Sequence, residues 1–235
     1  MDLILGAEHL NRILEDVEDL LVSYRTDDGL RYLDYKPSTD PNRLMPEDLA
    51  VTILINSRAR ASAFKSAQDK GADLLLETLP TVVLERTTPA ERDQVADLIA
   101  EMACWDGLAA SIATKILHKK RPKLIPILDN EAIFGAYMNP RWPARRASQE
   151  SVYARSRIRE ALEWIATDLT RPENTTSWER LAELEPKRSR IELFDMVWWV
   201  HFRRVQSVST RAQVWPGAAV ATVSTSAKET PAAGR

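Results

Sequence analysis

Segment 107–134 contains the residue types and spacings that indicate more than packing. Two predicted helices are joined there by a basic connection limited by prolines, HKKRPKLIPILD, and the second helix begins at the carboxylate of Asp129. Four cations beside a predicted hairpin have the charge to contact phosphate groups. These cations are Lys119, Lys120, Arg121 and Lys123. Two simpler roles fit the same residues: a solvated connection for the cations, and for Asp129 a helix N-cap, which stabilises a helix by ~1 kcal/mol.

This segment resembles the core of the helix-hairpin-helix DNA glycosylase superfamily. In that family a hairpin of the type L-P-G-V-G-x-K-T-A leads into a buried helix, and an aspartate in a V-D context begins the helix that follows. Here Gly107 and Ala109 fall on the hairpin glycines, Ser111 on the lysine, and Leu128-Asp129 on the V-D pair, with no gap. The resemblance implies a multi-helix, glycosylase-like bundle in which the hairpin residues Gly107, Ala109 and Ser111 contact DNA.

The activity implied by the resemblance is hydrolysis of an N-glycosidic bond, with Asp129 as the catalytic residue. That reaction builds positive charge on the sugar, which a fixed carboxylate stabilises while it orients or deprotonates water. Because Ser111 replaces the Schiff-base lysine of bifunctional members, base release without a lyase step is expected. The target base must leave the stack and enter a pocket with apolar or aromatic walls. Candidates for that pocket are Trp105, Tyr137, Trp142, Trp198 and Trp199.

A catalytically silent helical module that binds nucleic acid or a protein partner is the alternative. It is favoured by Ala109 and Ser111, which replace the glycine and the lysine of the family pattern, and by the acidic first half of the chain, which repels DNA. A second polar group that converges on Asp129 would distinguish an enzyme from such a module, and the sequence does not place one. A third hypothesis is a small-molecule enzyme that uses Arg31, Asp34 and Tyr35 of a long loop together with Asp129.

A second similarity involves two short patterns. The core KRPKLIPILD and the P-x-D-L-A-V pattern at 46–51 are similar to an uncharacterised bacterial family of helical proteins. That family has no assigned activity, so this similarity predicts helical structure and no chemistry.

Charge is unevenly distributed along the 235 residues, although the net charge is only −2. Residues 1–106 carry 11 Lys and Arg against 21 Asp and Glu, whereas residues 118–159 carry 10 against 3. The basic segment, in which Arg145 and Arg146 extend the patch of cations at 119–123, predicts DNA as a partner. The other interpretation is that the basic segment folds against the acidic one within the molecule.

Composition excludes several classes of protein. One cysteine, Cys104, and three histidines exclude a disulfide framework and a zinc finger. The sequence also lacks the phosphate-loop, dinucleotide, zinc-protease and serine-hydrolase motifs, so no cofactor and no metal are expected. The N-terminus has no basic leader region, and no apolar run approaches the ~18 residues that span a bilayer. We therefore expect a cytoplasmic protein without membrane contact.

The elements that must position these residues have helical periodicity, which predicts an all-α fold. Helices are predicted over 10–24, 46–55, 59–70, 72–79, 88–104, 108–119, 129–137 and 148–169, and from about residues 176 and 189. Two of these helices are predicted to begin with capping boxes, at Thr88–Glu91 and at Thr176–Glu179. Loop 25–43 is expected to contain only a short extended piece at 30–35. The predicted organisation is one helical domain over 1–206, or two lobes over 1–86 and 87–206, followed by a flexible tail over 207–235.

Overall fold

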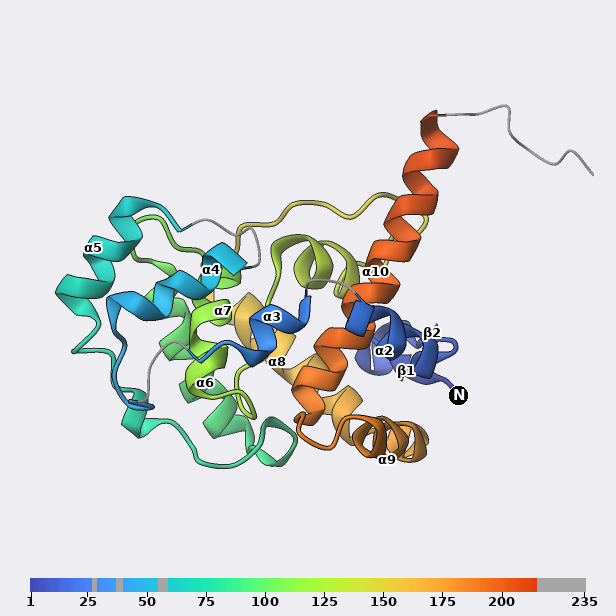
Figure 1. The fold of residues 1–235 in the computed structure, drawn as a ribbon, viewed down its shortest axis with the longest axis horizontal. Helices are drawn as coiled ribbons and strands as arrows, with labels where there is room; N and C mark the ends of the chain where they lie inside the picture. The colour runs from blue at the N-terminus through green and yellow to red at the C-terminus, as the bar shows by residue number, and fades with distance from the viewer. Residues whose placement is uncertain (27–28, 37–39, 55–58, 215–235) are drawn as a thin grey trace, which may run out of the picture.

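The computed structural model describes the chain over residues 1–26, 29–36, 40–54 and 59–214 (Figure 1). Helices account for most of these residues, which confirms the predicted all-α fold. The described part also contains a small antiparallel sheet, in which β1 (Leu3–Leu5) pairs with β2 (Arg12–Leu14). Within the same part of the chain, no helix is long and apolar enough to cross a membrane.

The helices follow one another with short connections. The α-helices are α1 (Ala7–Leu10), α2 (Val17–Thr26), α3 (Gly29–Asp34), α4 (Val51–Leu54), α5 (Ala61–Lys70), α6 (Pro89–Ala103), α7 (Ala110–Lys120), α8 (Arg155–Thr170), α9 (Thr175–Leu184) and α10 (Arg190–Val214). Short 3₁₀ helices are η1 (Pro46–Ala50), η2 (Leu76–Thr78), η3 (Leu84–Arg86) and η5 (Pro172–Asn174), and η4 (Asn130–Tyr137) is a π-helix.

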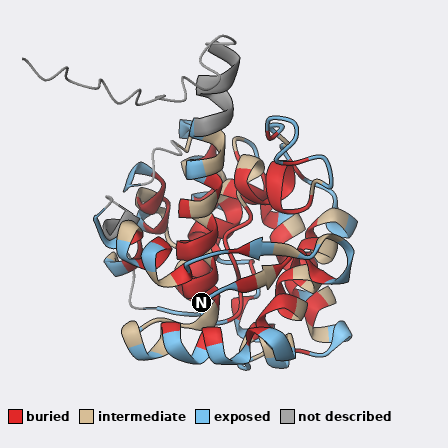
Figure 2. Cartoon of the chain, turned by 90° about the vertical axis from the view of Figure 1, so that its right-hand side faces the viewer, coloured by how far each residue is buried: buried red, intermediate tan, exposed pale blue. Residues whose placement is uncertain are grey.

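Helix α7 runs through the centre of the molecule, as the apolar character of its sequence predicts (Figure 1). Helices α6 and α4 pack against it, and Ala113, Ile116 and Leu117 are fully buried. Helix α10 packs against α2, α8, α9 and η4. One apolar cluster includes residues from Leu3 to Phe202, and Figure 2 shows these buried residues inside a shell of exposed ones. The centre of the fold is therefore set by α7 and α10.

The N-terminal segment differs from the predicted helix over 10–24. Helix α2 covers the second half of the predicted range, whereas its first half contains the end of α1, strand β2 and the turns around them. The chain turns at Gly6, Asn11 and Asp16, which have positive φ values of 97°, 45° and 50° and are residue types that tolerate this conformation. The carboxylate of Asp168 accepts the backbone N–H of Gly6 at 2.6 Å and that of the next residue at 2.9 Å. Distant hydrogen bonds therefore override the local helical pattern.

Two shorter predictions are also wrong. The piece at 30–35 is not extended but lies mainly in α3, because Tyr32 and Leu33 bury their side chains and the Tyr32 hydroxyl donates to the Lys115 carbonyl at 2.8 Å. Residues 72–79 form only the 3₁₀ turn η2. Their buried leucines stand at positions 74, 76 and 79, a spacing that no single helix face provides.

The helix predicted from residue 148 begins seven residues later, at Arg155. The intervening segment lies across η4 and α7: the Val152 carbonyl accepts the N–H of Ala110 at 3.0 Å, and the Ser148 carbonyl lies directly over Gly135. A Cβ at residue 135 would stand 1.9 Å from that oxygen, so only glycine permits this approach.

Of the two predicted capping boxes, one forms. The Thr88 N–H donates to Glu91 at 2.7 Å and the Glu91 N–H donates to the Thr88 hydroxyl at 3.3 Å, at the start of α6. Thr176 does not cap α9, which begins after Asn174. At the other end of the chain, α10 continues through positions 207–214 of the predicted tail, and residues 215–235 lie outside the described residues.

Candidate active site

Asp129 stands at the N-terminus of η4, where the sequence predicts a helix cap. Its Oδ1 accepts the backbone N–H groups of Glu131 at 2.9 Å and Ala132 at 3.1 Å. The preceding run of apolar residues is buried against α7, and the Leu128 N–H donates to the Thr114 hydroxyl at 3.0 Å. The backbone before the carboxylate and the helix after it therefore fix Asp129 from both sides.

The other oxygen of Asp129 meets two side chains from α7. Lys115 Nζ lies 2.8 Å from Oδ2, and the Ser111 hydroxyl donates to Oδ2 over a longer distance of 3.4 Å. These two residues are one helical turn apart and face the same way. The Lys115 side chain is 9% exposed and that of Asp129 is 21% exposed. The polar partner for Asp129 that the sequence did not reveal is therefore Lys115.

A second carboxyl group, that of Asp195 on α10, lies in the electrostatic range of this ion pair. Burial raises the pKa of Asp195 to about 7; Lys115 opposes that shift, and Asp129 and Glu192 add to it. Asp129 behaves in the opposite way. Burial alone raises its pKa, but the charge of Lys115 and the hydrogen bonds it receives outweigh burial and lower it. The two carboxyls therefore titrate far apart, and Asp195 still binds a proton at pH values where Asp129 is ionised, which is the arrangement of a base and an acid.

The raised pKa of Asp195 predicts a pH dependence of stability. Because the folded protein binds this proton more tightly than the unfolded chain, wild type should lose stability relative to Asp195→Asn as pH rises from about 4 to about 7. We expect the variant to be more stable at pH 8 by on the order of 1–2 kcal/mol, after allowance for solvent screening, and equally stable near pH 3.5. Urea unfolding of both proteins at the two pH values measures the difference in their free energies of unfolding. If that difference is the same at both pH values, the raised pKa of Asp195 is contradicted.

Three of the four cations predicted to contact phosphate instead hold the segment before η1. Lys119 donates to the Leu33 carbonyl at 3.0 Å and lies over the Tyr32 ring at 4.0 Å. Arg121 donates to the Pro41 carbonyl at 2.6 Å. Lys120 forms a buried ion pair with Asp48. The interpretation that the basic segment folds against the acidic one therefore accounts for these three side chains.

The other predicted DNA contacts have different surroundings. The side chains of Lys123, Arg145 and Arg146 are exposed to solvent. Gly107 has a φ of 79° at the turn between α6 and α7, as a hairpin glycine requires. Beyond that turn, Ala109 and Ser111 are buried, and the first amide of α7 is already bonded to the Val152 carbonyl. A phosphate at the start of α7 would therefore have to displace part of segment 148–154.

Three of the five aromatic residues predicted to line a pocket, Tyr137, Trp142 and Trp198, pack against one another in the core. Trp198 lies 5.4 Å from the ring of Tyr137 and 5.4 Å from the ring of Trp142. Its indole N–H also donates to the Ala132 carbonyl at 2.8 Å. Trp105 is buried as well, and only Trp199 is partly exposed, so aromatic burial in the core outweighs pocket formation.

The residues that sequence reasoning missed carry a recognisable signal. Lys115 is the one charged residue within the apolar stretch 107–117, and Asp195 follows Phe194 in the mainly apolar first turns of α10. A charge at a core position needs a charged partner, so each predicts a buried pair without identifying the other member. Within the described residues, no group of three metal-ligating side chains is found. The side chain of Arg31, from the third hypothesis, lies outside the described residues, and Asp34 pairs with Arg188 at 2.6 Å.

These features define an all-α protein with a largely buried lysine–aspartate pair and, within electrostatic range of it, a second carboxyl whose pKa is raised. The chain belongs to DUF6308, a family of unknown function, which matches residues 8–202. The match covers every residue of the candidate site and agrees with the expected uncharacterised family. Neither the curated proteins nor the solved structures give a match to the chain.

Proposed function

We propose that this protein is a monofunctional N-glycosidic hydrolase that releases a base from DNA. The observation that carries the proposal is the ion pair between Lys115 and Asp129, together with Asp195, a second carboxyl within electrostatic range of both whose pKa is shifted in the opposite direction to that of Asp129. Hydrolysis of an N-glycosidic bond needs a negative charge near the sugar and a proton for the departing base. Asp129 and Asp195 supply these two requirements.

The proposed reaction assigns one step to each group. The bond between the sugar and the base breaks, and the base leaves with the bond electrons and takes a proton from Asp195. Water adds to the sugar carbon and gives a proton to Asp129, and solvent exchange restores both carboxyls. Lys115 is a positioning residue that keeps Asp129 ionised and oriented. Because its amine is held in an ion pair, it is a poor nucleophile, so no imine and no strand cleavage are expected.

DNA would approach this site over the exposed arginines near η4. Arg145 and Arg146 lie in the connection between η4 and α8 and are exposed. Arg146 and Glu131 line the same small surface hollow, so this surface begins next to the first turn of η4. Positive charge here favours a polyanionic substrate without sequence preference.

A silent binding module is the second candidate, and a specific observation favours it. Lys119, Lys120 and Arg121 hold the chain's own backbone and the Asp48 carboxylate, and the first amide of α7 is bonded to Val152. Both groups of contacts reduce the number of donors available to DNA. This candidate predicts binding without any base release.

Base release by the wild-type protein is the decisive experiment. Duplexes that contain uracil, alkylated, oxidised or deaminated bases are incubated with the full chain and scored for strand breaks before and after alkaline cleavage of abasic sites. We expect breaks only after alkali, because the lysine at the site, Lys115, is held in its ion pair with Asp129 and is a poor nucleophile for imine formation. Breaks before alkali contradict the monofunctional assignment. No abasic sites on any substrate, with DNA binding retained, favour the silent module.

A further inference from the structure

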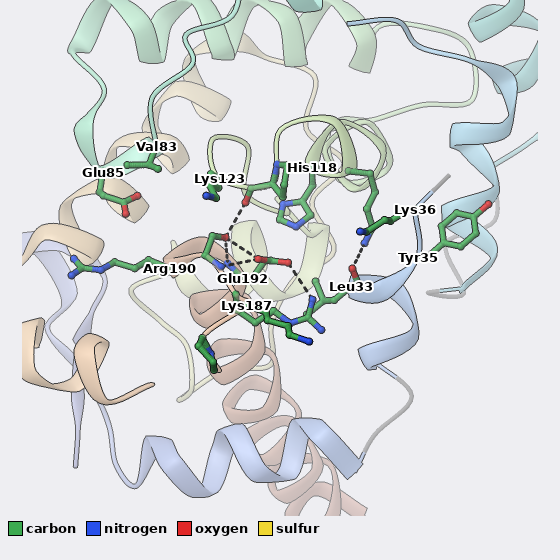
Figure 3. Close-up of a pocket in the computed structure, with 15 residues that line it drawn as sticks. Leu33, Tyr35, Lys36, Val83, Glu85, His118, Lys123, Lys187, Arg190 and Glu192 are labelled. Carbon is green, nitrogen blue, oxygen red and sulfur yellow. Dashed lines mark hydrogen bonds and ion pairs between the residues drawn. The ribbon is translucent and has the colours of Figure 1, made fainter. Parts of the chain in front are cut away.

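A cavity lies at the C-terminal end of α7, the end opposite the turn at Gly107. It is bounded by the end of α3, the end of α7 and the first turn of α10 (Figure 3). Its volume is about 550 Å³, within the range of small-molecule sites. None of its lining residues belongs to the candidate active site. Figure 3 shows His118, Lys123 and Glu192 on its inner wall and Lys36 and Arg190 at its opposite sides.

The wall of this cavity is strongly cationic. Six cations line it against two carboxylates, Glu85 and Glu192. The cations are Lys36, Lys119, Lys123, Lys187, Arg188 and Arg190. Glu192 already accepts the N–H of Ser189 at 2.8 Å and pairs with Arg188 at 3.5 Å. Lys36, Lys123 and Lys187 are exposed, so a cluster of positive charge remains for an anion.

His118 adds an independent observation, because it is a buried polar group with an unused acceptor. It is 1% exposed, and its Nδ1 lies 2.7 Å from the Ile125 carbonyl. A carbonyl only accepts, so Nδ1 carries the proton; burial lowers the pKa of His118 to about 4, so the ring is neutral. Its Nε2 is therefore a lone-pair acceptor, and this buried atom has no hydrogen-bond partner. Such an atom favours a ligand that supplies a hydroxyl donor.

We propose that this cavity binds a small sugar phosphate, whose phosphate group contacts the lysines at the rim and whose hydroxyl donates to Nε2 of His118. A phosphate satisfies several cations at once, and a sugar supplies hydroxyl donors at a distance from the charge. The volume of the site fits a phosphorylated monosaccharide or a nucleoside monophosphate rather than a duplex.

Calorimetric titration of the full chain tests this site with ribose 5-phosphate, AMP and, as a phosphate-free probe, ribose. We expect the two phosphorylated probes to bind at low salt and ribose to bind far more weakly. Lys123→Gln and Lys187→Gln should each weaken binding about 10-fold, the loss that follows from removing one charge-assisted hydrogen bond. Lys70→Gln is the matched control, because Lys70 is an exposed lysine of α5 outside the cavity.

His118→Asn tests the second half of the proposal. The asparagine amide can still donate to the Ile125 carbonyl, but it offers no acceptor at the position of Nε2, so weaker binding of ribose 5-phosphate is expected. Unfolding curves without ligand establish that each variant is folded. Several outcomes overturn the proposal: no binding of either phosphorylated probe at millimolar concentration, equal binding of ribose, or an equal loss in Lys70→Gln. So does a duplex that binds through the same lysines and is not displaced by ribose 5-phosphate.

Discussion

Asp129→Asn is expected to lower the rate of base release by about 10³-fold while leaving the fold intact, because it removes the charge that stabilises the sugar cation. Asparagine can still accept the N–H groups of Glu131 and Ala132, so η4 keeps its cap. The ion pair with Lys115 is lost, and we expect stability to fall by about 1–3 kcal/mol. The rate of base release is measured under single-turnover conditions on a duplex from which the wild-type protein releases a base. The change in stability is measured by urea unfolding.

Glu131→Gln is the matched control for this prediction. Glu131 lies two residues further along the chain and is also partly exposed, and its carboxylate accepts hydrogen bonds from the side chains of Gln149 and Gln206. Its activity should stay close to that of wild type. If both variants lose the same activity, the effect comes from the general negative charge at the start of η4. If Asp129→Asn is less stable but equally active, Asp129 is a helix cap and not a catalytic residue.

Lys120→Met is expected to destabilise the protein by about 3–5 kcal/mol, because it leaves a buried carboxylate without its counter-ion. Lys120 Nζ lies 2.6 Å from Asp48 Oδ2, and the two side chains are 2% and 0% exposed. The same ammonium group donates to the Asp40 carbonyl at 3.0 Å, and the Asp48 carboxylate caps η1 by accepting the Met45 N–H at 2.8 Å. Chemical unfolding measures the loss.

Lys123→Met provides the comparison from the same basic segment. Lys123 is exposed, so its replacement should change stability by less than about 0.5 kcal/mol. Adding Asp48→Asn to Lys120→Met should recover part of the lost stability, since the unpaired charge is then removed. Equal effects of the two lysine variants are incompatible with a structural role for Lys120.

The Asp48–Lys120 ion pair also explains why two distant sequence patterns occur in one fold. Asp48 belongs to the P-x-D-L-A-V pattern and Lys120 to the KRPKLIPILD core. The pair joins η1 to the end of α7 and thereby places both patterns against the same helix. Sequence alone indicates each pattern, but the contact between them depends on the tertiary fold.

Much of the fold follows from local pattern, and the errors have a common cause. The buried α7, the capping box at Thr88 and the cap at Asp129 are all signals carried by neighbouring residues, and each is confirmed. The predicted helix over 10–24 and the helix start at Ser148 are wrong, because backbone groups there bond to residues far along the chain. Local periodicity contains no information about those partners.

The residues of the candidate site form two similar groups: one that local sequence predicts, and one that only the tertiary fold identifies. Asp129 is found from sequence because a carboxylate after a buried apolar run and before a helix is a local feature. Lys115 and Asp195 reach it from the middle of α7 and from α10, and only the packing of these helices shows that they converge. The cations of the basic segment were a misleading signal for DNA, because Lys119 and Arg121 find their acceptors in the segment before η1.

The hydrogen bonds that hold β1 set the order in which this chain completes its fold during synthesis. The Asn174 side chain accepts the Ile4 N–H at 2.8 Å and donates to the Ile4 carbonyl at 2.8 Å, across 170 residues of sequence. At a translation rate of ~5–20 residues per second, Ile4 waits roughly 10–30 s for that partner to be made. During this interval its backbone groups and the buried leucines of β1 are open to chaperones and to other nascent chains. A polypeptide that stops before Asn174 never closes this segment.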